Sequence, residues 1–272
     1  MCIPFVGDWH YYHRKRGMQT SSDDILLAAA ASFPHLVFGC NSNAGANLPP
    51  PIERYLDMGC GIGSSLLLVA YNSRPSFALG VEVQQASFQM VSRSIAELPP
   101  PSFTSSSPHP RLEALHGDLR SVLFTATFDT ITANPPYLPA DSGTVPQDPQ
   151  RRGARFEMHG GVEDYCKTAA RILSPAGRFL LAFWHRDRAR VERAAALGGL
   201  GISRRLDVIG GAHGRVEPHL SIWELRLLLS PTEPPAPFPV HMLDITRTLS
   251  GGLNPNYRAI QAALNMRARP LK

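Results

Sequence analysis

Residues 52–63 read Ile-Glu-Arg-Tyr-Leu-Asp-Met-Gly-Cys-Gly-Ile-Gly, an apolar run that ends near an acid and continues into a Gly-x-Gly-x-Gly loop. The run predicts a strand over residues 52–58, and residues 64–71 predict a helix. Glycines at a strand-to-helix turn permit a tight bend and a close approach of backbone to ligand. The free N–H groups at the start of the helix add to such a site. The stretch therefore predicts an α/β fold with a ligand at this loop.

Strands and helices alternate beyond the loop, which predicts a mostly parallel sheet covered on both faces. Strands are expected at residues 52–58, 76–83, 112–116, 127–133 and 178–184, and helices at 64–71, 85–98, 162–173 and 187–197. Residues 202–209 and 219–229 are typical of a closing antiparallel pair. The expected fold is α/β and Rossmann-like, with a seven-stranded, mostly parallel sheet that ends in an antiparallel hairpin.

Three parts are expected along the chain. Residues 1–50 hold a helix start at residues 22–30, which is expected to cover one edge of the sheet. Residues 51–229 form the main domain, and residues 230–272 form a Pro-rich connection and a C-terminal tail. Residues 41–51 and 99–110 are rich in Pro, Ser, Asn or Gly and are expected to be surface loops.

The composition excludes some classes and leaves others open. The 272 residues are 43% hydrophobic and 18% charged, which predicts a globular core. A net charge of +5 is compatible with an anionic partner such as RNA, but it is modest. No apolar run is long enough for a bilayer, and the N-terminus lacks a secretory signal. The cysteines form no Cys-x-x-Cys pair, so neither a metal site nor a disulfide framework is expected, and a reducing, cytoplasmic location is predicted.

Acidic residues follow the expected strands at positions that suit a nucleoside. Glu82 lies about 20 residues beyond the glycines, where an acid can accept hydrogen bonds from ribose hydroxyls. Asp118 follows the third expected strand and could meet an adenine amino group, although a helix cap or turn is the alternative. The glycine loop alone fits a dinucleotide as well as S-adenosylmethionine.

A second motif, Asn134-Pro135-Pro136-Tyr137, follows the expected strand 127–133. Proline cannot donate to a strand ladder and forces the preceding residue out of the helical region, so the motif predicts a stiff, extended segment. It places an amide beside an aromatic ring. That arrangement suits a planar, amine-bearing group and has no role in hydride transfer.

The chemistry that fits this motif is methyl transfer to nitrogen. An exocyclic amino group is a poor nucleophile because its lone pair is delocalised into the ring. If the Asn134 side-chain oxygen and the Pro135 carbonyl accept its hydrogens, the lone pair is exposed, while Tyr137 stacks on the base. No general base is needed, and a paired base must first be flipped out.

Together these residues resemble the class I S-adenosylmethionine-dependent methyltransferases that act on amino or amide nitrogen. The chain is most similar to the bacterial tRNA(Val) adenine-37 N6-methyltransferase family over about residues 10–229. Residues 17–27 are similar to that family's N-terminal cofactor lid, with Ser22-Asp23 where Thr-Asp is usual. The resemblance implies Asn134, Pro135 and Tyr137 as catalytic residues. It implies a cofactor site made of Ser22, Asp23, Asp57, Gly59, Gly61, Gly63, Glu82, Asp118, Leu119 and Asn134. The Pro-rich insertions and residues 243–272 depart from the family pattern.

Two other functions stay open. A protein-glutamine N5-methyltransferase of the release-factor type uses the same motif, and Arg155-Phe156-Glu157 resembles a segment of that family. That family usually has an additional N-terminal helical domain, for which residues 1–50 are too short. The other alternative is a catalytically silent RNA-binding subunit, which the intact motif disfavours. If RNA is the partner, basic clusters near Arg14, Arg151, Arg155 and Arg204 are the predicted contacts.

Overall fold

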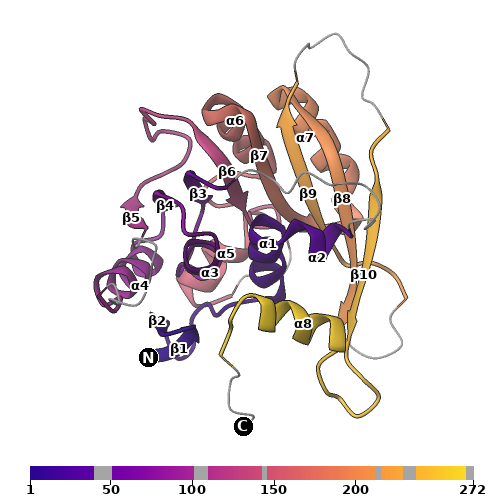
Figure 1. The fold of residues 1–272 in the computed structure, drawn as a ribbon. Helices are drawn as coiled ribbons and strands as arrows, with labels where there is room; N and C mark the ends of the chain where they lie inside the picture. The colour runs from indigo at the N-terminus through magenta and orange to yellow at the C-terminus, as the bar shows by residue number, and fades with distance from the viewer. Residues whose placement is uncertain (40–50, 101–109, 143–145, 212–215, 229–236, 268–272) are drawn as a thin grey trace.

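An eight-stranded sheet forms the centre of the computed structural model, which describes residues 1–39, 51–100, 110–142, 146–211, 216–228 and 237–267 (Figure 1). The strand order is β10-β8-β9-β7-β6-β3-β4-β5. Strand β9 is antiparallel to both of its neighbours, and the other neighbouring pairs are parallel. The strands are β3 (Arg54–Met58), β4 (Phe77–Glu82), β5 (Arg111–His116), β6 (Phe128–Ala133), β7 (Leu173–Trp184), β8 (Leu200–Gly211), β9 (Leu220–Leu227) and β10 (Val240–Thr246).

The α/β class, the parallel centre and the antiparallel hairpin β8–β9 are confirmed, but the expected seven strands are eight. The additional strand, β10, lies in the segment that was expected to be a tail. It pairs in parallel with β8 from Val240↔Arg205 to Thr246↔Gly211. Its sequence alternates between exposed and more buried residues, a weak signal because an edge strand buries little surface.

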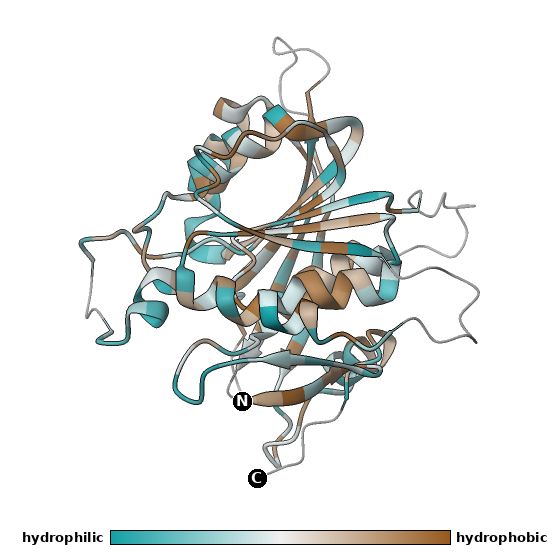
Figure 2. Cartoon of the chain, turned by 90° about the vertical axis from the view of Figure 1, so that its left-hand side faces the viewer, coloured by the Kyte–Doolittle hydropathy of each residue, from teal (hydrophilic) through white to brown (hydrophobic). Residues whose placement is uncertain are grey.

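Helices cover both faces of the sheet. They are α1 (Ser22–Ser32), α2 (Pro34–Phe38), α3 (Ser64–Ser73), α4 (Gln85–Ala96), α5 (Pro149–Arg155), α6 (Val162–Ile172), the 3₁₀ helix η1 (His185–Asp187), α7 (Arg188–Gly198) and α8 (Pro255–Ala263). Strand β7 supplies both cores, because Leu180 and Ala182 pack with α1 and α3 while Phe179 and Leu181 pack with α6 and α7. This alternation follows from the period of two in a strand. Figure 2 shows hydrophobic residues concentrated on the sheet and on the sides of helices that face it.

Helix α1 lies over β6, β7 and β9 and beside α3, so the expectation that it covers an edge of the sheet is wrong. Residues 25–31 are all buried, and four of them are alanines. Short side chains around the whole helix allow neighbours to pack on several sides, which places it in the middle of the molecule. The helix begins with a capping box in which Ser21 and Asp24 bond reciprocally.

The N-terminal hairpin was not anticipated. Strands β1 (Cys2–Val6) and β2 (Trp9–Tyr12) form a separate two-stranded sheet that packs against α3 and α4. The expected loops at residues 41–51 and 99–110 and the connection at 230–239 lie largely outside the described residues. None of the helices in the described ranges has the length and apolarity needed to cross a membrane.

Candidate active site

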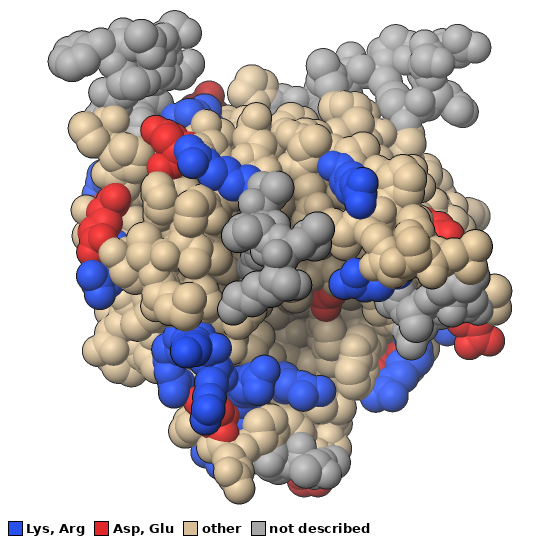
Figure 3. All heavy atoms as spheres, turned by 90° about the horizontal axis from the view of Figure 1, so that it is seen from below, with Lys and Arg blue, Asp and Glu red and all other residues tan. Residues whose placement is uncertain are grey.

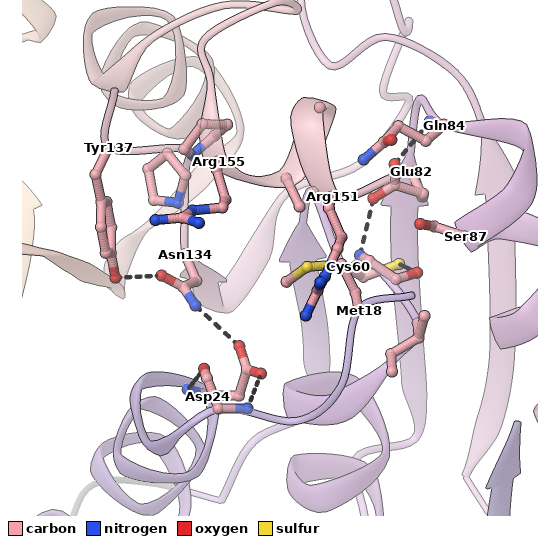
Figure 4. Close-up of a pocket in the computed structure, with 18 of the residues that line it drawn as sticks. Met18, Asp24, Cys60, Glu82, Gln84, Ser87, Asn134, Tyr137, Arg151 and Arg155 are labelled. Atoms are coloured by element: carbon pink, nitrogen blue, oxygen red, sulfur yellow. Dashed lines mark hydrogen bonds between the residues drawn. The ribbon is translucent and has the colours of Figure 1, made fainter. Parts of the chain in front are cut away.

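A cavity of about 540 Å³ opens at the carboxyl ends of β3, β4, β6 and β7 (Figure 4). In the sheet order, β4 and β6 lie on opposite sides of β3, so their following loops diverge and leave a crevice there. Residues 18–24 and α5 supply the remaining walls. The lining residues include Met18, Gln19, Ser21, Asp23, Asp24, Gly59, Cys60, Gly61, Ser64, Glu82, Gln84, Ser87, Asn134, Pro135, Pro136, Tyr137, Arg151, Arg155, His159, Tyr165 and Trp184.

The cavity has two chemically different ends, which Figure 4 places on opposite sides. We call the part around Gly61, Glu82 and Gln84 the glycine-loop end. The part around Asn134 and Tyr137 is the motif end.

At the glycine-loop end, the chain bends where the sequence predicts. Gly59 and Gly61 have φ angles of +68° and +58°, which favour glycine. A Cβ added at Gly61 would meet no atom within 4 Å, so the backbone is open there, whereas one at Gly59 would lie 2.5 Å from the Tyr165 hydroxyl. The Glu82 carboxylate accepts the backbone N–H groups of Gly61 at 2.8 Å and Gln84 at 2.6 Å. Glu82 thus fixes the loop, and its carboxylate still has lone pairs that can accept from a ligand.

At the motif end, the Asn134 amide is oriented by Asp24 of the first turn of α1 and by the Tyr137 hydroxyl, which also contacts Asp23. The Asn134 Nδ2 donates to Asp24 Oδ1 at 2.9 Å. The Tyr137 hydroxyl lies 2.6 Å from Asn134 Oδ1 and 2.8 Å from Asp23 Oδ2. A hydroxyl has one proton, so it donates to one of these acceptors at a time. When it donates to Asp23, the Asn134 oxygen can accept from a substrate N–H.

Three carboxyls lie at or behind the cavity: Glu82 and Asp57 are buried, and Asp24 is partly buried. Burial raises the pKa of Asp24 and of Glu82, and it raises the pKa of Asp57 to about 7 despite a 2.7 Å hydrogen bond from Thr132. Within the described residues, no Lys or Arg forms a salt bridge with any of the three. A cationic ligand would compensate this charge.

The N-terminal segment is joined to α5 across the mouth of the cavity. The buried Gln150 side chain accepts from the Met18 N–H at 3.2 Å and donates to Ser87 at 3.0 Å. Arg14 forms an ion pair with Asp148 at 2.9 Å. These contacts hold residues 14–18 against the start of α5, so the wall is made of two segments that are far apart in sequence.

Two arginines of α5 face the cavity. Arg151 and Arg155 are one helical turn apart, and both line the pocket while remaining exposed (Figure 4). Neither guanidinium forms an ion pair or hydrogen bond within the described ranges. The end of α5 is tied to the motif because Leu138 N–H donates to the Arg155 carbonyl at 3.0 Å. Arg14 and Arg204 differ, since Arg14 pairs with Asp148 and Arg204 with the buried Glu224 at 2.5 Å.

The predicted site residues divide into two groups. The structure brings together Asp23, Gly59, Gly61, Glu82, Asn134, Pro135 and Tyr137 around the cavity. Ser22, Asp57, Gly63, Asp118 and Leu119 are not among the lining residues. The Ser22 hydroxyl donates to Asp23, and a Cβ at Gly63 would lie 2.7 Å from Val91 of α4. Leu119 is buried in the core.

Asp118 is engaged with its own neighbour. Its carboxylate pairs with Arg120 at 2.5 Å, and this contact lowers its pKa. It also accepts the Arg120 N–H at 2.9 Å, as the turn alternative predicts.

Several lining residues were not singled out from the sequence. Asp24 accepts a hydrogen bond from the Asn134 amide. Its position in the first turn of α1 indicated a helix-capping residue, and it does form a capping box with Ser21. Gln84 follows a predicted strand, Tyr165 lies in a predicted helix and Trp184 ends a predicted strand, but their residue types give no chemical signal by themselves. Within the described part of the chain, no group of three or more His, Cys, Asp or Glu side chains could hold a metal ion.

No protein-family model matches this chain. Among curated proteins, a "tRNA1(Val) (adenine(37)-N6)-methyltransferase" of Mannheimia succiniciproducens is 25% identical over 70% of this chain and 68% of its own length. A protein of the same name from Vibrio vulnificus is 30% identical over 60% of this chain and 57% of its own length. A "Release factor glutamine methyltransferase" of Caulobacter vibrioides is 25% identical over 50% of this chain and 47% of its length. The matches thus span from about half to two thirds of these relatives.

Solved structures share the fold. A "predicted O-methyltransferase" from Agrobacterium tumefaciens superposes with a TM-score of 0.54 at 16% identity, covering 92% of this chain and all of that one. A proposed class I S-adenosylmethionine-dependent methyltransferase from Listeria monocytogenes gives 0.53 at 17% identity, covering 92% and 73%. The printed names of the sequence relatives and of the structural neighbours agree on methyl transfer, although not on the acceptor. The chain is therefore similar in sequence to methyltransferases that act on nitrogen, and it shares the fold of class I S-adenosylmethionine-dependent methyltransferases.

Proposed function

We propose that this protein methylates the exocyclic N6 of an adenine in RNA, with tRNA as the favoured RNA. The observation on which the proposal rests is the Asn134 amide at the cavity, whose Nδ2 donates to Asp24 and whose Oδ1 lies 2.6 Å from the Tyr137 hydroxyl. A carbonyl oxygen has two lone pairs, so Oδ1 can also accept from a planar amine. The tRNA-modifying relatives support the choice of acceptor.

The cavity fits S-adenosylmethionine, which supplies an electrophilic methyl group on a sulfonium. The open backbone at Gly61 leaves room beside the loop, and the Glu82 carboxylate is placed to accept from ribose hydroxyls. Asp23 and Asp24 offer negative charge to the ammonium and sulfonium of a cationic cofactor. Gly61 and Glu82 would therefore hold the nucleoside part of the cofactor, and Asp23 and Asp24 would hold its cationic part, with the methyl group supplied to the motif end.

At the motif end, the residues prepare the nitrogen. Asn134 Oδ1 and the Pro135 carbonyl accept the two N–H hydrogens of the amino group, which favours the pyramidal form and exposes the lone pair. The nitrogen lone pair then forms a bond to the methyl carbon as the carbon–sulfur bond breaks. The amine proton is released to solvent afterwards. Catalysis is mainly positioning, because Asp24 and Tyr137 fix the amide before substrate binds.

The two unpaired arginines support a nucleic-acid acceptor. Arg151 and Arg155 line the same cavity as Asn134, and neither has a carboxylate partner within the described residues. Their positions suit phosphates that flank an extruded base. Lys and Arg side chains also gather beside a hollow on the face seen in Figure 3. A glutamine side chain would require no such charge.

Protein-glutamine methylation is the second candidate, favoured by the similarity to the release-factor enzyme. One experiment separates the two functions. The enzyme is incubated with tritiated S-adenosylmethionine and with separate tRNA, ribosomal RNA and protein fractions, each then digested to nucleosides or peptides. N6-methyladenosine in RNA is the expected product. Label found only as methylglutamine would overturn the RNA assignment, and cofactor binding without transfer to any fraction would favour the silent subunit.

A further inference from the structure

Trp184 is a large aromatic residue at the motif end for which the methyl-transfer chemistry gives no role. It is the last residue of β7, it is half-buried, and it lines the cavity. Its ring centroid lies 5.3 Å from that of Tyr137, with the planes tilted by 45°. Tyr137 is itself confined, because the Phe183 ring contacts it at 5.2 Å and its hydroxyl lies between Asp23 and Asn134.

Arg186 covers the Trp184 ring. Its guanidinium carbon lies 3.9 Å from the ring centroid, while its side chain is 67% exposed and has an ion pair of 3.5 Å with Asp187. A cation–π contact at an exposed site is weaker than the stacking of a base on an aromatic side chain. A nucleobase can therefore replace the guanidinium on the indole, and the released arginine can turn to a phosphate.

We propose that Trp184 is the stacking surface for the acceptor base, with Arg186 as a displaceable cover. This inference rests on the proposed function, since it concerns how the same cavity holds a nucleobase. It assigns to Trp184 the flat contact that the sequence assigned to Tyr137. Tyr137 then acts mainly through its hydroxyl. A wide indole surface favours a purine over the small amide of a glutamine side chain, so Trp184 also determines acceptor specificity.

The three tryptophans make this testable by fluorescence. Trp9 and Trp223 are 1% and 0% exposed, which leaves Trp184 as the tryptophan that a base can reach. Short unstructured oligoadenylate is titrated into the intact protein at saturating S-adenosylhomocysteine. We expect quenching of the emission in the wild type and its loss in Trp184→Phe. Trp223→Phe is the matched control, because it removes a buried indole whose N–H has no partner in the described residues. A glutamine-containing peptide should not quench.

Kinetics with unmodified tRNA supply the second readout. We expect Trp184→Ala to raise KM for tRNA at least 10-fold with kcat changed less than 3-fold, and Trp184→Phe to recover most of that loss. The Kd for S-adenosylmethionine should stay within 2-fold in both variants, which excludes misfolding. Quenching that persists in Trp184→Phe, or a KM for tRNA unchanged in Trp184→Ala, would overturn the inference. If the wild type methylates only protein, the proposed function fails instead, and that result is seen before any variant is made.

Discussion

Replacement of Asn134 by alanine tests the arrangement at the motif end most directly. The substitution removes the amide that Asp24 and Tyr137 orient, and with it the side-chain acceptor for the substrate amine. Loss of one preorganised hydrogen-bonding group that acts on the reacting atoms lowers kcat by about 10²–10³. In the proposed mechanism Asn134 contacts the nucleophile itself, so we expect a fall in kcat of at least about 10².

The structural cost of Asn134→Ala can be separated from the catalytic one. The variant leaves the partly buried Asp24 Oδ1 without its donor, and a hydrogen bond to a charged group contributes about 1.5–3 kcal/mol. We therefore expect the free energy of unfolding to fall by about 2 kcal/mol and Tm by about 4–8 °C. A domain of ordinary stability remains folded at 25 °C after such a loss.

The assay is single-turnover transfer of tritiated methyl to unmodified tRNA at saturating enzyme, with the Kd for S-adenosylmethionine measured by calorimetry. We expect the Kd to change by less than about 3-fold, since the glycine-loop end is intact. The control, Tyr137→Phe, keeps the amide and loses only the hydroxyl, so its rate should fall less than that of Asn134→Ala. A rate for Asn134→Ala within 3-fold of wild type would refute the mechanism.

Three further predictions concern the rest of the cavity. Glu82→Ala should weaken S-adenosylmethionine binding at least 10-fold by calorimetry, because Glu82 fixes the glycine loop and offers lone pairs to the ribose; an unchanged Kd would exclude that role. The pKa of Asp57 is raised to about 7, so the folded protein binds this proton more tightly than the unfolded chain does. The free energy of unfolding of the cofactor-free protein should therefore fall as pH rises from about 4 to 7, by up to ~4 kcal/mol from this group. Asp57→Asn should flatten that part of the urea-unfolding profile, and an equal slope in the variant would contradict the assignment. The double variant Arg151→Ala/Arg155→Ala should raise KM for tRNA and reduce its salt dependence, whereas Arg152→Ala, on the same helix but not lining the cavity, should do neither.

The sequence was sufficient for the strands and helices at the centre of the sheet. Apolar strands and amphipathic helices depend on periodicity, which is local, so β3, β4, β6 and β9 lie within a few residues of their expected ranges. Short elements were missed for the same reason. Helix α5 spans only seven residues and is rich in arginine, so it has no clear apolar stripe, although it forms one wall of the cavity.

Side-chain roles were predictable where the backbone dictates them. The glycines at residues 59 and 61 have positive φ as the turn requires, and Glu82 reaches the loop because parallel strands end at the same edge. The role of the Asp118 side chain could not be predicted in this way. Its position after β5 is as predicted, but a neighbouring Arg120 pairs with its carboxylate, and nothing in the strand pattern indicates that competition.

The sequence by itself therefore determined the fold class, the glycine loop and the Asn-Pro-Pro-Tyr motif, because each depends on the conformational preferences of consecutive residues. The tertiary structure alone decided which groups meet across the cavity: Asp24 with Asn134, Gln150 with Met18, and Trp184 with Tyr137. Such contacts join residues far apart in the chain, and they depend on how the helices pack on the sheet and on which buried polar groups must find partners.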